Sequence, residues 1–250
     1  MGFQHYIWLY FWTAPHALLL AVAVMMYRRQ QHRDFPIFFS YLLFEFLQFG
    51  VLFTMYLLEA PAMAYVKVDI IGRAGSIALH FGILQELFEA PVAHSVPLRR
   101  EVARILNFIM IALMLLAAVF IGALYRGSLD PWLIRAYVII DPLNTAQCGL
   151  IVLVFLWHRF LGLRMLPLAF GIAVGIGLTT GLEPVFLALK NIAAADSYRA
   201  VDIAQMATYH IVAVLWFYYA QVREKVILNS EAGLVDLREQ AAELGRIAHL

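Results

Sequence analysis

Hydrophobic residues occur along this chain in long runs, separated by short polar stretches. An α-helix needs about 20 apolar residues to cross the hydrocarbon core of a bilayer. The pattern therefore predicts an all-α, polytopic membrane protein, with a seven-transmembrane-helix bundle over residues 1–221. The predicted spans cover roughly residues 5–27, 36–58, 65–90, 103–124, 132–157, 165–189 and 198–221.

The composition agrees with a membrane protein. The chain is 63% hydrophobic and 14% charged, with a mean hydropathy of +0.79, whereas soluble domains have about a quarter charged residues. The first span follows no positively charged segment and no small-residue cleavage site follows it, so we expect it to be retained. We expect the lipid bilayer as partner, in a bacterial inner (cytoplasmic) membrane. The net charge of +1 gives no sign of a nucleic-acid partner.

The positive charges predict the orientation of the bundle. The connections that follow the first, third, fifth and seventh spans contain ten Lys and Arg residues, and the other set of connections contains five. Cytoplasmic loops are enriched in Lys and Arg. We therefore expect the N-terminus outside and the C-terminus inside.

After the last span, residues 222–250 form a second unit, charged and helical in pattern. Apolar residues follow a seven-residue spacing that a coiled coil would use, and Ser230 interrupts it. This cytoplasmic helix is expected either to pair in a homodimer or to lie along the inner leaflet. The apolar positions are Ile227, Leu234, Leu237, Ala241, Leu244 and Ala248.

A Tyr-x-x-x-Asp pattern occurs in three of the predicted spans, the third, fifth and seventh. These spans run in the same direction, so their aspartates should lie at similar depth, one to two turns below the outer surface. An internal repeat would explain the pattern. The three pairs are Tyr65 and Asp69, Tyr137 and Asp141, and Tyr198 and Asp202.

Further polar residues continue each pattern at helical spacing. A charge at the bilayer centre costs about 3 kcal/mol, so such residues need partners or water. One interpretation is that they only join helices by hydrogen bonds. The other is an outward-facing polar, acidic pocket, with ligand- or ion-binding residues Tyr65, Asp69, Arg73, Tyr137, Asp141, Asn144, Glu183, Tyr198, Asp202 and Gln205.

Three histidines, His16, His80 and His210, are expected near mid-membrane. Neutral imidazoles are common metal ligands, so a metal site or a haem is a possible cofactor arrangement for an intramembrane enzyme. Retinal is not expected. Its Schiff base requires a buried lysine, and the lysines of this chain are predicted near span ends, at Lys67, Lys190 and Lys225.

The segment "SIALH", Ser76 to His80, resembles the Ser-x-x-x-His element of the seven-helix membrane hydrolases related to ceramidases and adiponectin-type receptors. That resemblance implies a zinc-dependent hydrolase. Those proteins also have a His-x-x-x-His pair on the last span. Here Met206 and Val214 stand at the matching positions around His210, so the activity is not transferred to this chain.

Three functions are compatible with these patterns. The first is a sensor or receptor-like signalling module that works as a homodimer and binds a small polar or cationic ligand, or protons, from outside. Clustered carboxylates repel one another and so take up protons readily, which could itself be the signal. The second is a proton or cation carrier. The third is the metal- or haem-dependent enzyme.

Overall fold

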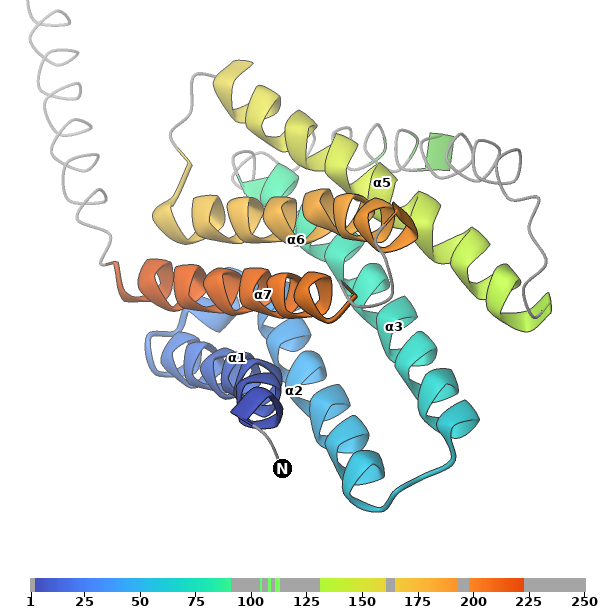
Figure 1. Ribbon diagram of the computed structural model, residues 1–250. Helices are drawn as coiled ribbons and strands as arrows, with labels where there is room; N and C mark the ends of the chain where they lie inside the picture. The colour runs from blue at the N-terminus through green and yellow to red at the C-terminus, as the bar shows by residue number, and fades with distance from the viewer. Residues whose placement is uncertain are drawn as a thin grey trace, which may run out of the picture.

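The described part of the chain is helical and contains no β-strand. A computed structural model (Figure 1) describes residues 3–90, 104, 108, 111, 112, 131–160, 165–192 and 198–222. Its elements are α1 (Phe3–Arg28), the short 3-10 helix η1 (Gln31–Arg33), α2 (Pro36–Leu57), α3 (Ala62–Glu89), α5 (Pro131–Phe160), α6 (Pro167–Ile192) and α7 (Tyr198–Gln221).

Six of the seven predicted spans are confirmed as helices, with ends that differ from the prediction by a few residues. The predicted fourth span, 103–124, lies outside the described residues except for four helical positions. The predicted C-terminal helix, 222–250, lies outside them apart from Val222. The seven-helix count and the orientation of the bundle therefore stay predictions.

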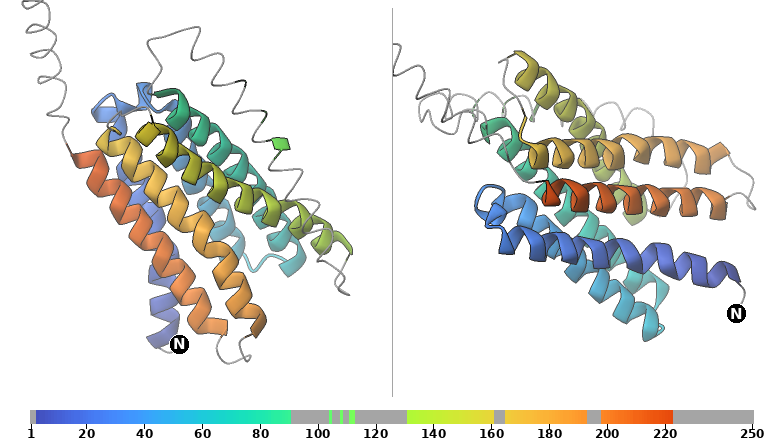
Figure 2. Two further views of the ribbon diagram at one scale, coloured as in Figure 1. Left: turned by 90° about the horizontal axis from the view of Figure 1, so that it is seen from above. Right: turned by 90° about the vertical axis from the view of Figure 1, so that its left-hand side faces the viewer.

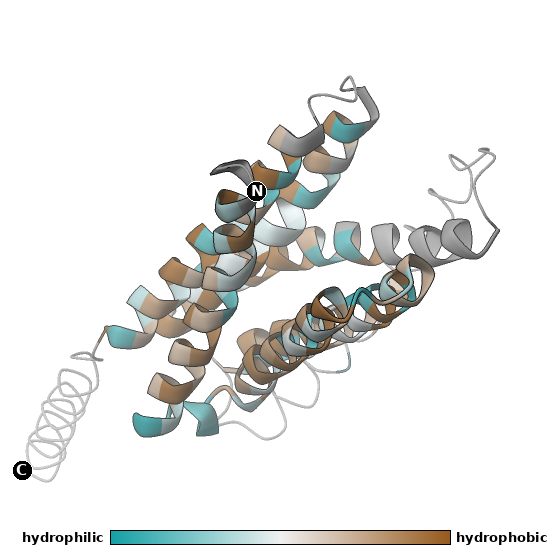
Figure 3. Cartoon of the chain, turned by 60° about the horizontal axis from the view of Figure 1, so that its bottom comes forward, coloured by the Kyte–Doolittle hydropathy of each residue, from teal (hydrophilic) through white to brown (hydrophobic). Residues whose placement is uncertain are grey.

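Four described helices, α1, α2, α6 and α7, are long and apolar enough to cross a membrane. Large hydrophobic side chains on the outer surfaces of the helices are exposed, for example Leu47, Ile71, Val152 and Ile211. Most of the coloured helical turns in Figure 3 are accordingly hydrophobic. A surface of this kind suits contact with lipid and indicates an integral membrane protein.

The six long helices form a closed ring in the order α1, α2, α3, α5, α6 and α7 (Figures 1 and 2). The helix α7 packs against α1, so the first and last described helices of the chain are neighbours. A further contact joins α3 to α6. The ring thus encloses a space that several helices can line at once.

An apolar core fills this ring of helices over one half of its length along the helix axes, and this half is the apolar half of the ring. Its fully buried side chains come from all six long helices, and they include Leu19, Phe38, Leu84, Leu150, Ile172 and Trp216. These residues lie toward the C-terminal ends of α1, α3, α5 and α7 and toward the N-terminal ends of α2 and α6. The opposite half, next to the N-terminus of α1, contains the polar residues described below.

Two side chains tie helix ends together at the end of the bundle nearest this core. The Glu86 carboxylate accepts hydrogen bonds from the backbone N–H groups of Ile37 and Phe38, in the first turn of α2. The Arg29 guanidinium donates to the backbone oxygens of Ala220 and Gln221 at 2.9 and 2.7 Å, at the end of α7. Both contacts satisfy backbone groups that a helix end leaves unpaired, with the charge that the helix dipole favours.

Glycines allow α6 and α7 to approach closely. Gly171 and Gly175 lie against the rings of Tyr219 and Trp216. The Trp216 indole N–H donates to the backbone oxygen of Gly171 at 3.1 Å. The helix α6 continues through Pro184 without a break.

We expect Gly175→Ala to lower the stability of the bundle. An added Cβ would lie 2.1 Å from Nε1 of Trp216, and this indole is fully buried. Overpacking of this kind costs about 1–3 kcal/mol. Thermal unfolding in detergent micelles would measure the change. The matched control is Gly181→Ala on the same helix, where a Cβ meets nothing within 4 Å; equal melting temperatures for the two variants would contradict the close packing.

Candidate functional site

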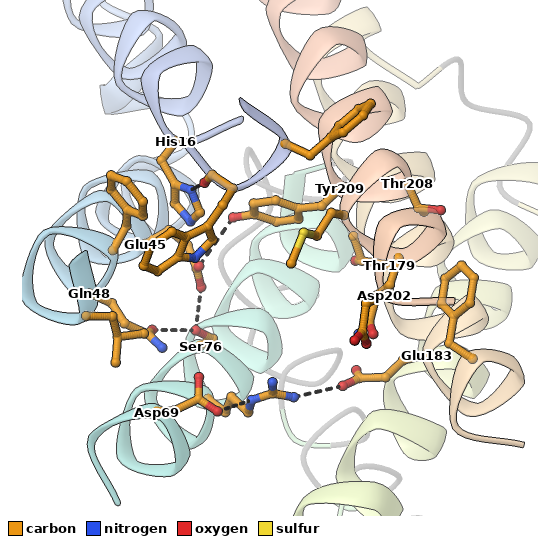
Figure 4. Close-up of a pocket in the computed structure, with 18 of the residues that line it drawn as sticks. His16, Glu45, Gln48, Asp69, Ser76, Thr179, Glu183, Asp202, Thr208 and Tyr209 are labelled. Atoms are coloured by element: carbon orange, nitrogen blue, oxygen red, sulfur yellow. Dashed lines mark hydrogen bonds and ion pairs between the residues drawn. The ribbon is translucent and has the colours of Figure 1, made fainter. Parts of the chain in front are cut away.

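A cavity of about 410 Å³ opens between α1, α2, α3, α6 and α7 (Figure 4). It occupies the half of the ring next to the N-terminus of α1. On α3, for example, the cavity is lined from Asp69 to His80, whereas the apolar core begins at Ile83. The same change from cavity to core occurs on α7 between Tyr209 and Val212. The apolar core therefore lies directly beyond the deepest lining residues.

The most buried acid of this cavity is Glu45, on α2. Its Oε1 accepts a hydrogen bond from the Ser76 hydroxyl, and its Oε2 accepts one from the Tyr209 hydroxyl at 3.2 Å (Figure 4). Within the described part of the chain, no cationic side chain forms an ion pair with this carboxylate. Glu45 is therefore held in place by neutral donors from α3 and α7.

A second group of charges is centred on Arg73, on α3. Its Nε lies 2.9 Å from Oδ2 of Asp69, one turn away, and its Nη1 lies 3.6 Å from Oε1 of Glu183 on α6. The other oxygen of Glu183 accepts a hydrogen bond from Nδ2 of Asn144 at 2.7 Å. This group links α3, α6 and α5 through polar contacts.

A third group joins α6 to α7. Nζ of Lys190 lies 2.7 Å from Oδ1 of Asp202 and donates to Oε1 of Gln205 at 3.0 Å. Lys190 is two residues from the end of α6. Although it lies at a helix end, its side chain is part of the cavity wall.

The described lining contains more acid than base. Its carboxylates outnumber its Lys and Arg side chains by four to two, so the cavity is negative when all of them are ionised. The acidic side chains are Glu45, Asp69, Glu183 and Asp202, and the basic ones are Arg73 and Lys190.

Aromatic rings form much of the remaining wall. The His16 ring stacks on Phe49 with 4.2 Å between ring centroids and 13° between planes, and Nδ1 of His16 lies 2.8 Å from the backbone oxygen of Trp12. Aromatic faces attract cations through their quadrupole. The aromatic lining residues are Phe11, Trp12, Tyr41, Phe49, Phe186 and Tyr209.

Several of the residues singled out in the sequence meet in this lining. The structure places Asp69, Arg73, Glu183, Asp202 and Gln205 in the cavity wall, together with His16 and His80.

Other predicted residues have different positions. Asn144 lines a neighbouring recess of about 90 Å³. Tyr65 is half-buried on α3 and is not part of either wall. Tyr137, Asp141 and Tyr198 fall within α5 and α7, but their side chains lie outside the described part of the structure.

The three histidines of the metal hypothesis do not share one site. His16 and His80 line the cavity, whereas the His210 ring lies against Tyr10 and Phe11, with ring centroids 5.6 and 5.9 Å away. Among the described residues, no three His, Cys, Asp or Glu side chains are grouped as a metal site requires. The geometry of this part of the chain thus gives no support to a metal centre.

Two important lining residues were not among the sequence candidates. Glu45 is the only charged residue of the second predicted span, and an isolated carboxylate in an apolar span is itself a functional signal. Lys190 was assigned only to a span end. Its contact with Asp202 depends on how α6 and α7 pack, which hydropathy does not show.

Comparisons with family models, with curated proteins and with solved structures give no match for this chain. The function is therefore argued from the geometry and chemistry of the cavity.

We expect the cavity to admit water and small water-soluble reagents. In a Cys148→Ala background, which removes the single cysteine of the chain, Thr179→Cys and Gln205→Cys should react with a charged methanethiosulfonate. Both positions line the cavity. Ile176→Cys and Val212→Cys are controls on the same two helices, because both native side chains are fully buried.

Mass spectrometry of intact cells or oriented vesicles would measure the labelling. The cavity residues should react from one side of the membrane only. Labelling of the two lining positions from opposite sides, or no labelling above the controls, would refute a shared water-filled cavity.

Proposed function

We propose that this protein is a membrane-embedded sensor or receptor-like module that binds a small cationic ligand in the cavity. The observation that supports it is the combination of excess carboxylates with aromatic walls. Carboxylates provide counter-charge and aromatic faces provide cation–π attraction, and together they suit an ammonium group. The cavity volume of about 410 Å³ lies in the range of small-molecule sites.

Glu45 is the natural counter-ion for such a ligand. Arg73 is already paired with Asp69 and Glu183, and Lys190 with Asp202. Among the described residues, the Glu45 carboxylate accepts hydrogen bonds from hydroxyl groups and forms no ion pair, and Arg73 acts on it only at longer range. A bound ammonium would therefore supply the direct ion pair that this carboxylate lacks.

The position of the cavity favours a sensor over a carrier. A carrier must open its site alternately to both sides of the membrane. Here the cavity occupies one half of the ring, and fully buried apolar side chains from α1, α2, α3, α5, α6 and α7 pack the other half. A one-sided site of this kind is suited to detect a ligand and to retain it.

In this proposal the bundle has seven spans with the N-terminus outside, in a bacterial inner membrane, as the distribution of Lys and Arg predicts. The cavity then faces outward. The helix of residues 222–250 pairs with a second copy on the inner side. A ligand that shifts α7 would change the position of this helix, since it follows α7 directly in the chain.

We expect Glu45→Gln to weaken ammonium binding at least tenfold, equivalent to about 1.4 kcal/mol. Its amide keeps the size of the side chain and removes the charge that attracts the cation. Suitable probes are 2-aminoethanol, choline and tetramethylammonium, with binding followed by thermal shift and by the change in total tryptophan fluorescence, to which Trp12 in the cavity wall contributes. Asp34→Asn is the control, because Asp34 is exposed beside η1 and outside the cavity lining.

Absence of binding by every probe, or equal losses in the two variants, would contradict the proposed function. Flux of protons or of the probe cation into liposomes, abolished by Asp69→Asn, would instead assign the protein to the carriers.

The dimer has its own test. The full chain should be a dimer in detergent solution, whereas a chain that ends at Lys225 should be a monomer, because the apolar positions that pair the helices are removed. Multi-angle light scattering with correction for bound detergent measures both masses. A monomer in both cases would remove the coiled coil from the proposal, and a dimer in both would move the interface to the bundle.

A further inference from the structure

His80 lies where the cavity meets the smaller recess, and it lines both. Its side chain is buried, with 8% of its surface exposed. One ring nitrogen, Nδ1, lies 3.2 Å from Oε1 of Gln147 on α5. The other, Nε2, is buried and has no hydrogen-bond partner. An unpartnered polar atom on a residue that lines a cavity indicates a place where a ligand group or a water binds.

The contact with Gln147 determines which nitrogen of His80 holds the proton. Nε2 of Gln147 donates to the backbone oxygen of Ile77 at 3.0 Å. A backbone carbonyl oxygen can only accept, so the NH₂ group of the amide must face Ile77 and its oxygen must face His80. Nδ1 of His80 is then the donor. Gln147 is fully buried, which keeps this arrangement fixed.

Nε2 of the neutral ring is consequently a hydrogen-bond acceptor. A second proton on it would create a buried cation, and none of the described carboxylates forms an ion pair with His80. Burying an unpaired charge inside a membrane bundle is costly. The group that completes the site must therefore be a donor, an O–H or an N–H.

This acceptor lies one helical turn beyond the contact of Glu45. Ser76, which donates to Glu45, precedes His80 by four residues on α3, a rise of about 6 Å. Tyr41 lies one turn before Glu45 on α2. The centroids of the Tyr41 and His80 rings are 4.8 Å apart. Glu45 and His80 line the same cavity, so one occupant of the cavity can contact both side chains.

We propose that the ligand is a small ammonium compound that also has a hydrogen-bond donor, with its cationic centre at Glu45 and its donor on Nε2 of His80. This inference rests on the proposed function and adds a selection rule to it. Cations without a donor fill the same space and leave the acceptor of His80 unpaired, so they bind more weakly.

Choline and its O-methyl ether test the rule directly. The nitrogen of choline has no N–H, so the hydroxyl is its single donor, and methylation of that oxygen removes the donor while the charge is unchanged. In the wild-type protein we expect choline to bind about tenfold more tightly than the ether, since a buried acceptor left unpaired costs about that much in affinity. Isothermal titration calorimetry in detergent would measure both constants.

Two variants assign the discrimination to His80. His80→Asn keeps a polar group near Gln147 and removes the Nε2 acceptor, so the two probes should bind equally. His80→Gln reaches further, places an amide oxygen near the position of Nε2, and should restore part of the preference. Melting temperatures without ligand report whether each variant is folded.

The outcomes separate the two proposals. Equal binding of choline and its ether to the wild-type protein would overturn the selection rule and leave the proposed function standing. Failure of all ammonium probes would overturn both. Stabilisation by Zn²⁺ alone, abolished in His80→Asn, would show that Nε2 binds a metal instead and would also overturn the rule. The wild-type comparison needs no variant, so it stands even if substitution of His80 prevents folding.

Discussion

A carboxylate inside a membrane bundle must receive its hydrogen bonds from the protein, because lipid supplies none. Glu45 meets this requirement with hydroxyl groups from Ser76 on α3 and Tyr209 on α7. These two bonds fix the rotation of α2, α3 and α7 about their axes, since a turned helix would leave the carboxylate unpaired. The remaining polar contacts of the ring follow the same rule, and they turn the polar faces of α3, α5, α6 and α7 inward.

The two halves of the ring have complementary physical properties. Apolar side chains such as Trp216 and Phe38 pack closely in one half, where Gly171 and Gly175 allow close approach and Arg29 joins the end of α7 to the end of α1. The other half contains a cavity and forgoes those dispersion contacts. The close packing of the apolar half therefore provides most of the dispersion contacts between the helices. In the half with the cavity, the helices are joined instead by separate polar contacts.

Much of the fold could be predicted from the sequence, and the cavity only in part. Hydropathy located six of the described helices because length and apolar content determine a span. The Tyr-x-x-x-Asp pattern indicated Asp69 and Asp202, which do line one cavity, because equal positions on parallel helices have equal depth. The depth of a residue in the membrane does not determine which residues of the other helices it contacts. Three contacts depend on the order of the helices around the ring, which the periodicity of a single sequence does not show. They join Glu45 to Tyr209, Lys190 to Asp202 and His80 to Gln147.

The closure of the ring by α1 and α7 has a consequence for biosynthesis. Contacts between these helices join residues about as far apart in sequence as the bundle allows, such as Arg29 and Ala220, 191 positions apart. The ribosome makes α1 and α2 long before α7, so a nascent chain already in the bilayer contains Glu45 before Tyr209 exists. Until α7 is inserted, the half-built bundle contains a carboxylate that lacks one of its two hydroxyl donors. The cavity therefore cannot be complete before α7 is in place, and a chain interrupted before α7 retains a carboxylate that lacks its Tyr209 donor.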